Sequence, residues 1–68
     1  MKRWNCEAKD EIEHPKVDAF LNEIISVCKK HGFSLSHEDF HGAFVVCGFN
    51  NDNAERLMYA HYNPFTGE

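Results

Sequence analysis

The stretch KKHGFSLSHEDFHGAFVVCGF, residues 29–49, decides the predicted fold because it contains a helix end followed by two strands. Gly32 comes directly after three basic residues and suits a left-handed helix C-cap. Residues 33–37 alternate apolar and polar side chains, which is typical of a half-buried strand. Residues 43–49 are apolar on both faces and rich in β-forming residues, which predicts a more buried strand. Residues 38–42 are few enough to connect the two strands as a hairpin.

Upstream of this stretch, the sequence predicts an amphipathic helix over residues 15–31. Pro15 suits the first helical position, where its missing N–H leaves no hydrogen bond unmade. Apolar side chains then recur at steps of three and four residues, so we expect them to face the core. They are Val17, Phe20, Leu21, Ile24 and Cys28, with Ile25 and Val27 widening the stripe.

Downstream, a second and shorter helix is predicted over residues 53–61. Asp52 is a suitable N-cap, and Glu55 three residues later completes a pattern like a capping box. An Asn–Pro step ends this helix, so residues 63–68 are expected to form a tail. Residues 1–13 carry little apolar content, and we expect an N-terminal arm there.

The predicted order is helix, strand, strand, helix (αββα), which places the chain in the α+β class as one small domain of 68 residues. A chain of this length buries only about 60% of the surface of its unfolded form. A two-stranded hairpin is marginal alone, and its second strand is apolar on both faces. We therefore expect a homo-oligomer that extends or covers the hairpin sheet.

Charge and cysteine content narrow the class of protein. The net charge of −4 disfavours nonspecific binding to nucleic acid, so a nucleic-acid-associated regulator is only the third interpretation. Cys6, Cys28 and Cys47 are widely spaced and form no CxxC pair, which favours reduced thiols in the cytoplasm. No apolar run suits a signal peptide or a bilayer span, so no membrane partner is expected.

The most conspicuous polar motif is His-Glu-Asp-Phe-His at residues 37–41, which matches HExxH letter by letter. Zinc proteases of that signature need the motif on a helix with a third ligand downstream, whereas here it joins two strands. Cys47 lies in the most apolar strand, where a thiol is a poor nucleophile. We therefore expect neither an enzyme nor a cofactor.

Three interpretations of this corner stay open. A zinc site would use His37, Asp39, His41 and His61. A purely structural turn would be capped by Ser36, Glu38 and Asp39. A binding site for a ligand or a partner is the third interpretation, because loops frequently carry function. The residues predicted for it are Ser36, His37, Glu38, Asp39 and His41, followed by Lys30 and Tyr62.

The stretch VDAFLNEIISVCKKHGFSLSHEDFHGAFVV, residues 17–46, resembles a group of small uncharacterised proteins encoded by bacteriophages and prophages. The shared core is KHG-x-S-x-SHED-x-HGAF, residues 30–44, preceded by an amphipathic helix and followed by a helix start. The resemblance implies a viral accessory protein in the cytoplasm of a host bacterium. It further implies inhibition of a host defence component, either by binding a protein or by sequestering a small nucleotide-like ligand.

Overall fold

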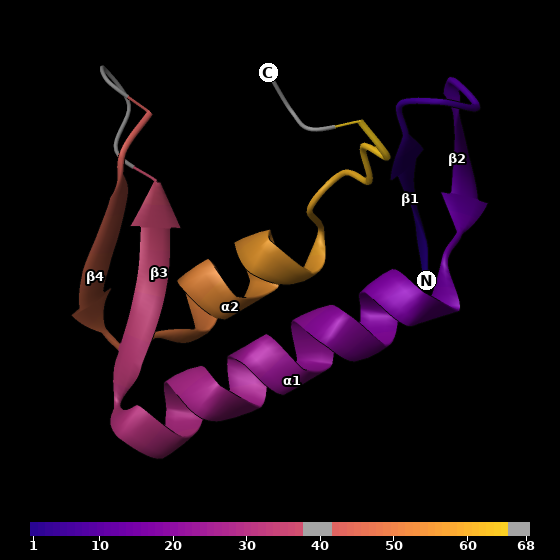
Figure 1. Ribbon diagram of the computed structural model, residues 1–68. Helices are drawn as coiled ribbons and strands as arrows, with labels where there is room; N and C mark the ends of the chain where they lie inside the picture. Colours follow the sequence, from indigo (N-terminus) through magenta and orange to yellow (C-terminus); the bar gives the residue numbers. More distant parts are fainter. Residues whose placement is uncertain (38–41, 66–68) are drawn as a thin grey trace.

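A computed structural model describes residues 1–37 and 42–65 of the chain, and within them it has two helices and two antiparallel hairpins (Figure 1). The α+β class predicted from the sequence is confirmed. The elements in chain order are β1 (Lys2–Asn5), β2 (Asp10–Glu13), α1 (Pro15–His31), β3 (Phe33–His37), β4 (Phe44–Gly48) and α2 (Asn51–Met58). The order therefore contains one hairpin more than the predicted αββα.

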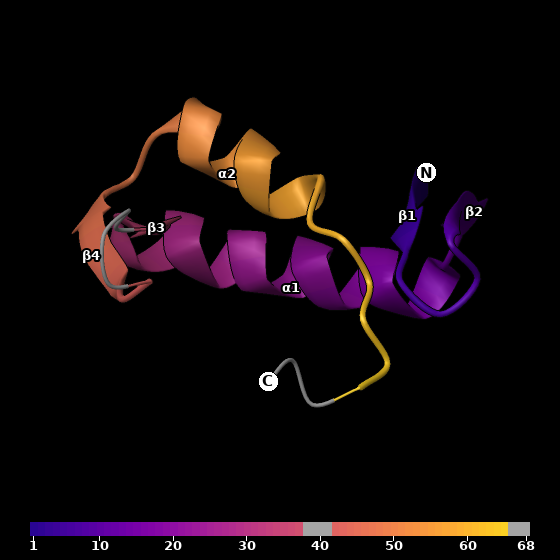
Figure 2. The ribbon, with the colours of Figure 1, turned by 90° about the horizontal axis from the view of Figure 1, so that it is seen from above.

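The two hairpins lie at opposite ends of α1, and α2 runs alongside α1 between them (Figures 1 and 2). The β3 strand faces both helices, whereas β4 forms the outer edge of its sheet. Within the described ranges, neither helix is long and apolar enough to cross a membrane. This arrangement makes the β3–β4 hairpin and α2 the elements that enclose the candidate site.

The bounds of α1 agree with the predicted helix. Pro15 occupies the first turn, and His14 Nδ1 accepts a hydrogen bond from the Val17 N–H at 3.4 Å. Gly32 ends the helix in the left-handed conformation, with φ of 76°. These signals are local to the chain, which is why the sequence predicts both ends of this helix.

The bounds of the β3–β4 hairpin agree with the prediction to within one residue at each end, with Leu35 opposite Val46 in its register. The prediction that the second strand is the more buried one is wrong, because β4 is largely exposed. Ser34 is buried and connects this hairpin to α2. Its hydroxyl donates to the Gly48 carbonyl at 2.8 Å and accepts from the Asn53 side-chain amide at 3.3 Å. The hairpin is thus held against α2 by polar contacts rather than by a large apolar core.

The predicted bounds of the second helix, 53–61, are wrong, because α2 both begins and ends earlier. Asn50, and not Asp52, is the N-cap, since its side-chain oxygen accepts from the Asn53 N–H at 2.8 Å. At the other end, the carbonyls of Met58 and Ala60 accept hydrogen bonds from a residue of β1. A partner distant in sequence therefore ends α2, and local propensity cannot reveal it.

Residues 1–13, expected as an arm, form the β1–β2 hairpin instead. Asn5 organises its turn, because its buried side-chain oxygen accepts from the N–H groups of Glu7 and Ala8 at 2.9 Å each. The turn also places Lys9 in the left-handed region, with φ of 55°. A lone asparagine with no glycine or proline in the turn after it is a weak turn signal, so the short strands around it were missed.

The chain after α2 returns to β1. Tyr62 donates its N–H to the Trp4 carbonyl and accepts from the Cys6 N–H, both at 2.8 Å. The Tyr62 ring also lies against the His14 ring, with centroids 4.3 Å apart. Tyr62 is therefore part of the packing around the N-terminal hairpin.

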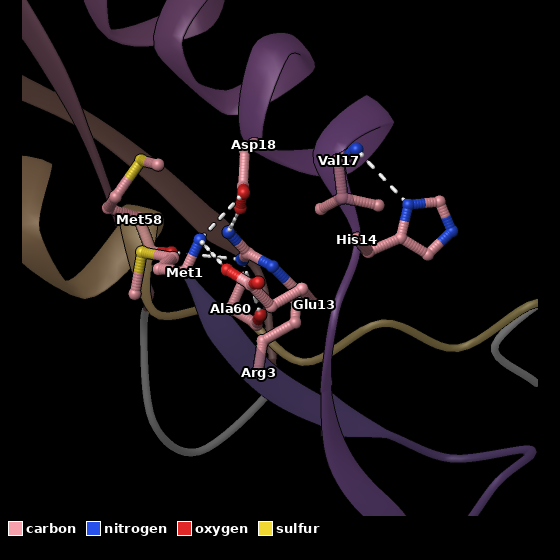
Figure 3. A network of polar contacts seen from close by, with 8 residues as sticks. All are labelled: Met1, Arg3, Glu13, His14, Val17, Asp18, Met58 and Ala60. Carbon is pink, nitrogen blue, oxygen red and sulfur yellow. Dashed lines mark hydrogen bonds and ion pairs between the residues drawn. The ribbon is translucent and has the colours of Figure 1, made fainter.

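Arg3 joins the N-terminal hairpin to both helices (Figure 3). Its buried guanidinium donates to the carbonyls of Met58 and Ala60 at 2.9 Å each and pairs with the carboxylate of Asp18 in α1. The N-terminal ammonium of Met1 reaches the same carboxylate at 2.9 Å. Both partners hold the pKa of Asp18 below its ordinary value, the hydrogen bond from the ammonium being the larger cause and that from Arg3 the second.

The apolar core is small, and Leu21, 4% exposed, is its one buried hydrophobic residue among the described residues. Val17, Ile24 and Cys28 of the predicted stripe are half-buried. Phe20 is 60% exposed, so its predicted place in the core is wrong. The apolar stripe on α1 is only partly covered by α2 and β3, because α2 has eight residues and α1 has seventeen.

Candidate functional site

The four predicted binding residues that the structure describes fall into three separate places. Glu38, Asp39 and His41 lie outside the described residues. Ser36 and His37 are the last two residues of β3, and both line a cleft that α2 also lines. The remaining two, Lys30 and Tyr62, lie elsewhere in the fold.

Lys30 and Tyr62 are not brought to the corner. Lys30 lies in the last turn of α1, before β3 begins, whereas His37 is the last residue of β3. A strand of that length separates its ends by about 13 Å. Tyr62 contacts β1, at the far end of α1 from the β3–β4 hairpin (Figure 1). Of the described residues predicted for the site, only Ser36 and His37 share one location.

Ser36 and His37 line a cleft of about 280 Å³ between the β3–β4 hairpin and α2, which we call the hairpin–α2 cleft. Leu35 and Phe44 complete the wall that the hairpin provides. Ser36 is half-buried, while His37 and Phe44 are exposed at the rim. The cleft therefore combines an apolar wall with a hydroxyl and an imidazole.

One face of α2 forms the opposite wall of the cleft. Its lining residues are Asn53, Arg56, Leu57 and, just after the helix, Ala60. They recur at three- and four-residue steps, which places them on the same side of a helix. Asn53 and Arg56 were not among the residues predicted for the site. The spacing of these residues along the helix could have indicated them, since it places Asn53 and Arg56 on the same side as Leu57.

The rim of the cleft carries two rings from neighbouring strands. His37 and Phe44 are opposite each other in the β3–β4 register, and their ring centroids lie 5.6 Å apart at 84°. Such an edge-to-face pair fixes the orientation of both rings. Because the Phe44 side chain remains 71% exposed, its ring is available to stack against a planar ligand.

The charge of the described lining is positive. Arg56 is the one lining residue that carries a permanent charge, and it forms no ion pair with any other described residue. No carboxylate and no thiol lies among these lining residues. The described lining residues thus offer donors to an anion and a ring surface, and no carboxylate stands among them to act as an acid or a base.

The described residues give no support to the zinc interpretation. Within residues 1–37 and 42–65, no three His, Cys, Asp or Glu side chains are grouped so that they could hold a metal ion. Asp39 and His41, two of the four ligands predicted for such a site, lie outside the described residues. The three cysteines are free thiols, each half-buried.

Comparisons with family models, with curated proteins and with solved structures find no match to this chain. The function of this chain is therefore to be inferred from the geometry of the cleft and from the sequence.

Proposed function

We propose that the chain is a non-enzymatic accessory binding protein that holds a small nucleotide-like ligand in the hairpin–α2 cleft. The observation that carries this proposal is the meeting of Arg56, from α2, with Ser36, His37 and Phe44, from the hairpin, around one cleft. An anionic group would pair with the Arg56 guanidinium and accept from the Ser36 hydroxyl. A planar base would stack on the exposed Phe44 ring.

The size of the cleft limits the ligand. A volume of about 280 Å³ lies just below the range for small-molecule sites, about 300–1,000 Å³. A mononucleotide or one half of a dinucleotide suits a cleft of this size, and the open side leaves room for the rest of a larger molecule. Sequestration of such a ligand in the cytoplasm of a host bacterium is the mode of action that we propose, in line with the resemblance to phage-encoded proteins.

The test is calorimetric titration with adenosine monophosphate, with adenosine and inorganic phosphate as partial ligands. We expect the mononucleotide to bind most tightly, because it uses both the ring surface and Arg56. Arg56→Ala should weaken its binding about 10- to 100-fold, since hydrogen bonds to charged groups contribute about 1.5–3 kcal/mol. Phe44→Ala should weaken it to a similar extent through lost base stacking.

Lys30→Ala is the matched control, because it removes an exposed cation at the other end of β3. We expect it to leave binding within about twofold of the wild type. Equal losses for Lys30→Ala and Arg56→Ala would mean that only general charge attracts the ligand. No heat and no thermal shift with any of the three ligands at millimolar concentration would contradict the proposal and favour inhibition through a protein surface.

A further inference from the structure

The β4 strand leaves one whole edge without a partner. Among the described strands it pairs only with β3, so its other edge carries unpaired backbone groups. Its five residues, FVVCG, include no charge and no proline. Proteins ordinarily protect an exposed edge with lysine, proline or a bulge, because an uncharged flat edge pairs with other chains. This edge has none of those devices.

The register shows which backbone groups point outward. The Phe49 N–H donates to the Gly32 carbonyl at 2.9 Å, just beyond the end of the ladder. In an antiparallel ladder, hydrogen-bonded pairs alternate with non-hydrogen-bonded pairs. Because Gly32 and Phe49 form a hydrogen-bonded pair, the next pair, Phe33–Gly48, is a non-hydrogen-bonded one. The pairs of that type are Phe33–Gly48, Leu35–Val46 and His37–Phe44. The outward N–H and C=O groups of β4 therefore belong to Phe44, Val46 and Gly48.

One of these outward groups is already used. The Gly48 carbonyl accepts from the Ser34 hydroxyl at 2.8 Å and from the Asn50 side-chain amide at 3.4 Å. Among the described residues, the N–H and C=O of Phe44 and Val46 and the N–H of Gly48 have no hydrogen-bond partner. Val46 is the central residue of the strand, so these groups are arranged symmetrically about it.

The side chains beside this edge are apolar and exposed. Val46, which is 64% exposed, stands opposite Leu35 on one face of the hairpin, and Leu35 also lines a groove of about 350 Å³ along α1. Phe20 and Val27 form the α1 side of that groove and are themselves exposed. The free edge and the uncovered part of the α1 stripe thus belong to one continuous apolar surface.

The exposed area of this chain is larger than that of a typical folded monomer of its mass. The whole chain exposes 5414 Å², whereas the mass scaling for folded monomers gives about 4,400 Å² at 7.9 kDa. The difference, about 1,000 Å², is close to the area of about 800 Å² that each partner buries in an interface of standard size. A chain with this surplus has enough surface for one more subunit contact.

We propose that a second copy of this chain docks on the β4 edge about a twofold axis through Val46, so that two hairpins form one four-stranded antiparallel sheet. The axis lets the two Val46 residues exchange a pair of N–H···O=C bonds. It also lets the Gly48 N–H of each copy donate to the Phe44 carbonyl of the other. A second copy is the occupant that fits, because the uncharged and symmetric edge is complementary to itself. The ligand cleft is not required for this pairing.

Sedimentation equilibrium of the full chain over the micromolar range tests the proposal. The wild type is expected at twice the chain mass of 7.9 kDa. Val46→Lys should lower the association constant at least about 100-fold, because it buries an unpaired charge beside its own copy. Tyr59→Lys, at a residue of similar exposure directly after α2, is the matched control and should leave the dimer intact.

A second variant separates the edge from the side chain. Val46→Pro removes an outward N–H but leaves the bonds to β3 in place, so it should also dissociate the dimer while circular dichroism remains that of the wild type. A wild-type monomer throughout the concentration range would overturn the proposal. So would a dimer that survives both Val46 variants, or one that Tyr59→Lys dissociates equally.

Discussion

Replacing Arg3 by alanine is expected to destabilise this fold more than any other change of a single cation. The Arg3 side chain is only 1% exposed and lies between β1, α1 and the end of α2 (Figure 3). It supplies two hydrogen bonds to the carbonyls of Met58 and Ala60. Without it, those carbonyls lose their donor and the N-terminal hairpin loses its main connection to the helices.

The magnitude follows from the two carbonyl bonds. Hydrogen bonds from a charged donor contribute at least about 1.5 kcal/mol each, so losing both costs about 3 kcal/mol. A domain of 68 residues has a free energy of unfolding of about 3–10 kcal/mol. Arg3→Ala therefore removes a third or more of the stability. With a urea m-value of about 1 kcal/mol/M, the unfolding midpoint should fall by about 3 M.

The assay is urea unfolding followed by circular dichroism at one fixed protein concentration. Lys2→Ala is the control, because Lys2 is the neighbouring cation on the exposed face of β1, and it should change the free energy of unfolding by less than about 0.5 kcal/mol. Arg3→Lys should fall between the two, since an ammonium cannot reproduce the fork of a guanidinium. An Arg3→Ala variant as stable as Lys2→Ala would refute this account of the N-terminal hairpin.

Three further outcomes are expected. Leu21→Ala should lower the free energy of unfolding in urea by about 2–5 kcal/mol and Tyr59→Ala by less than about 1 kcal/mol, because Leu21 is buried and Tyr59 is exposed. Equal losses for the two variants would contradict the position of the core. Gly32→Ala should lower the free energy of unfolding by about 1–2 kcal/mol, because φ of 76° is strained for alanine. The loss comes from the backbone alone, since no atom lies within 4 Å of the added Cβ. An unchanged free energy of unfolding would place the helix end elsewhere. Since the folded pKa of Asp18 is lowered, its stabilising effect is complete above the ordinary pKa of about 3.9 and is lost as the pH falls through the lower folded value. Unfolding midpoints measured from pH 5 to pH 2 should therefore fall less steeply for Asp18→Asn than for the wild type, and parallel curves would argue against the ion pair.

The parts of the fold that the sequence predicts are those with local signals. Pro15 and Gly32 define α1 at both ends, and the alternation after Gly32 predicts the β3–β4 hairpin. These features depend on neighbours within a few residues, so one sequence is enough to find them.

The parts that were missed depend on contacts between distant residues. Arg3 ends α2 from a position 55 residues away along the chain, and Tyr62 joins a strand that begins at Lys2. A lone arginine in a polar stretch has no feature that predicts burial, because charged residues are rarely buried. The β1–β2 hairpin was missed for a different reason, because the turn signal at Asn5 is weak.

The candidate site was predicted in part. The polar motif around residues 37–41 predicted Ser36 and His37, which line a cleft, but it did not predict Arg56 on the opposite wall. That residue is brought to the corner by the packing of α2 against β3. Lys30 was also predicted for the site, but the length of β3 separates it from the cleft.

Mapping adenosine monophosphate onto the protein by ¹H–¹⁵N NMR tests the central claim most directly, because each backbone amide reports on its own surroundings. The hairpin–α2 cleft predicts that the largest shifts on titration come from Ser36, His37, Phe44 and Arg56, and that they saturate together. The amides of Lys30 and Tyr62 should stay unchanged. Shifts centred on those two residues, or a spectrum unchanged at saturating ligand, would contradict the cleft as the binding site.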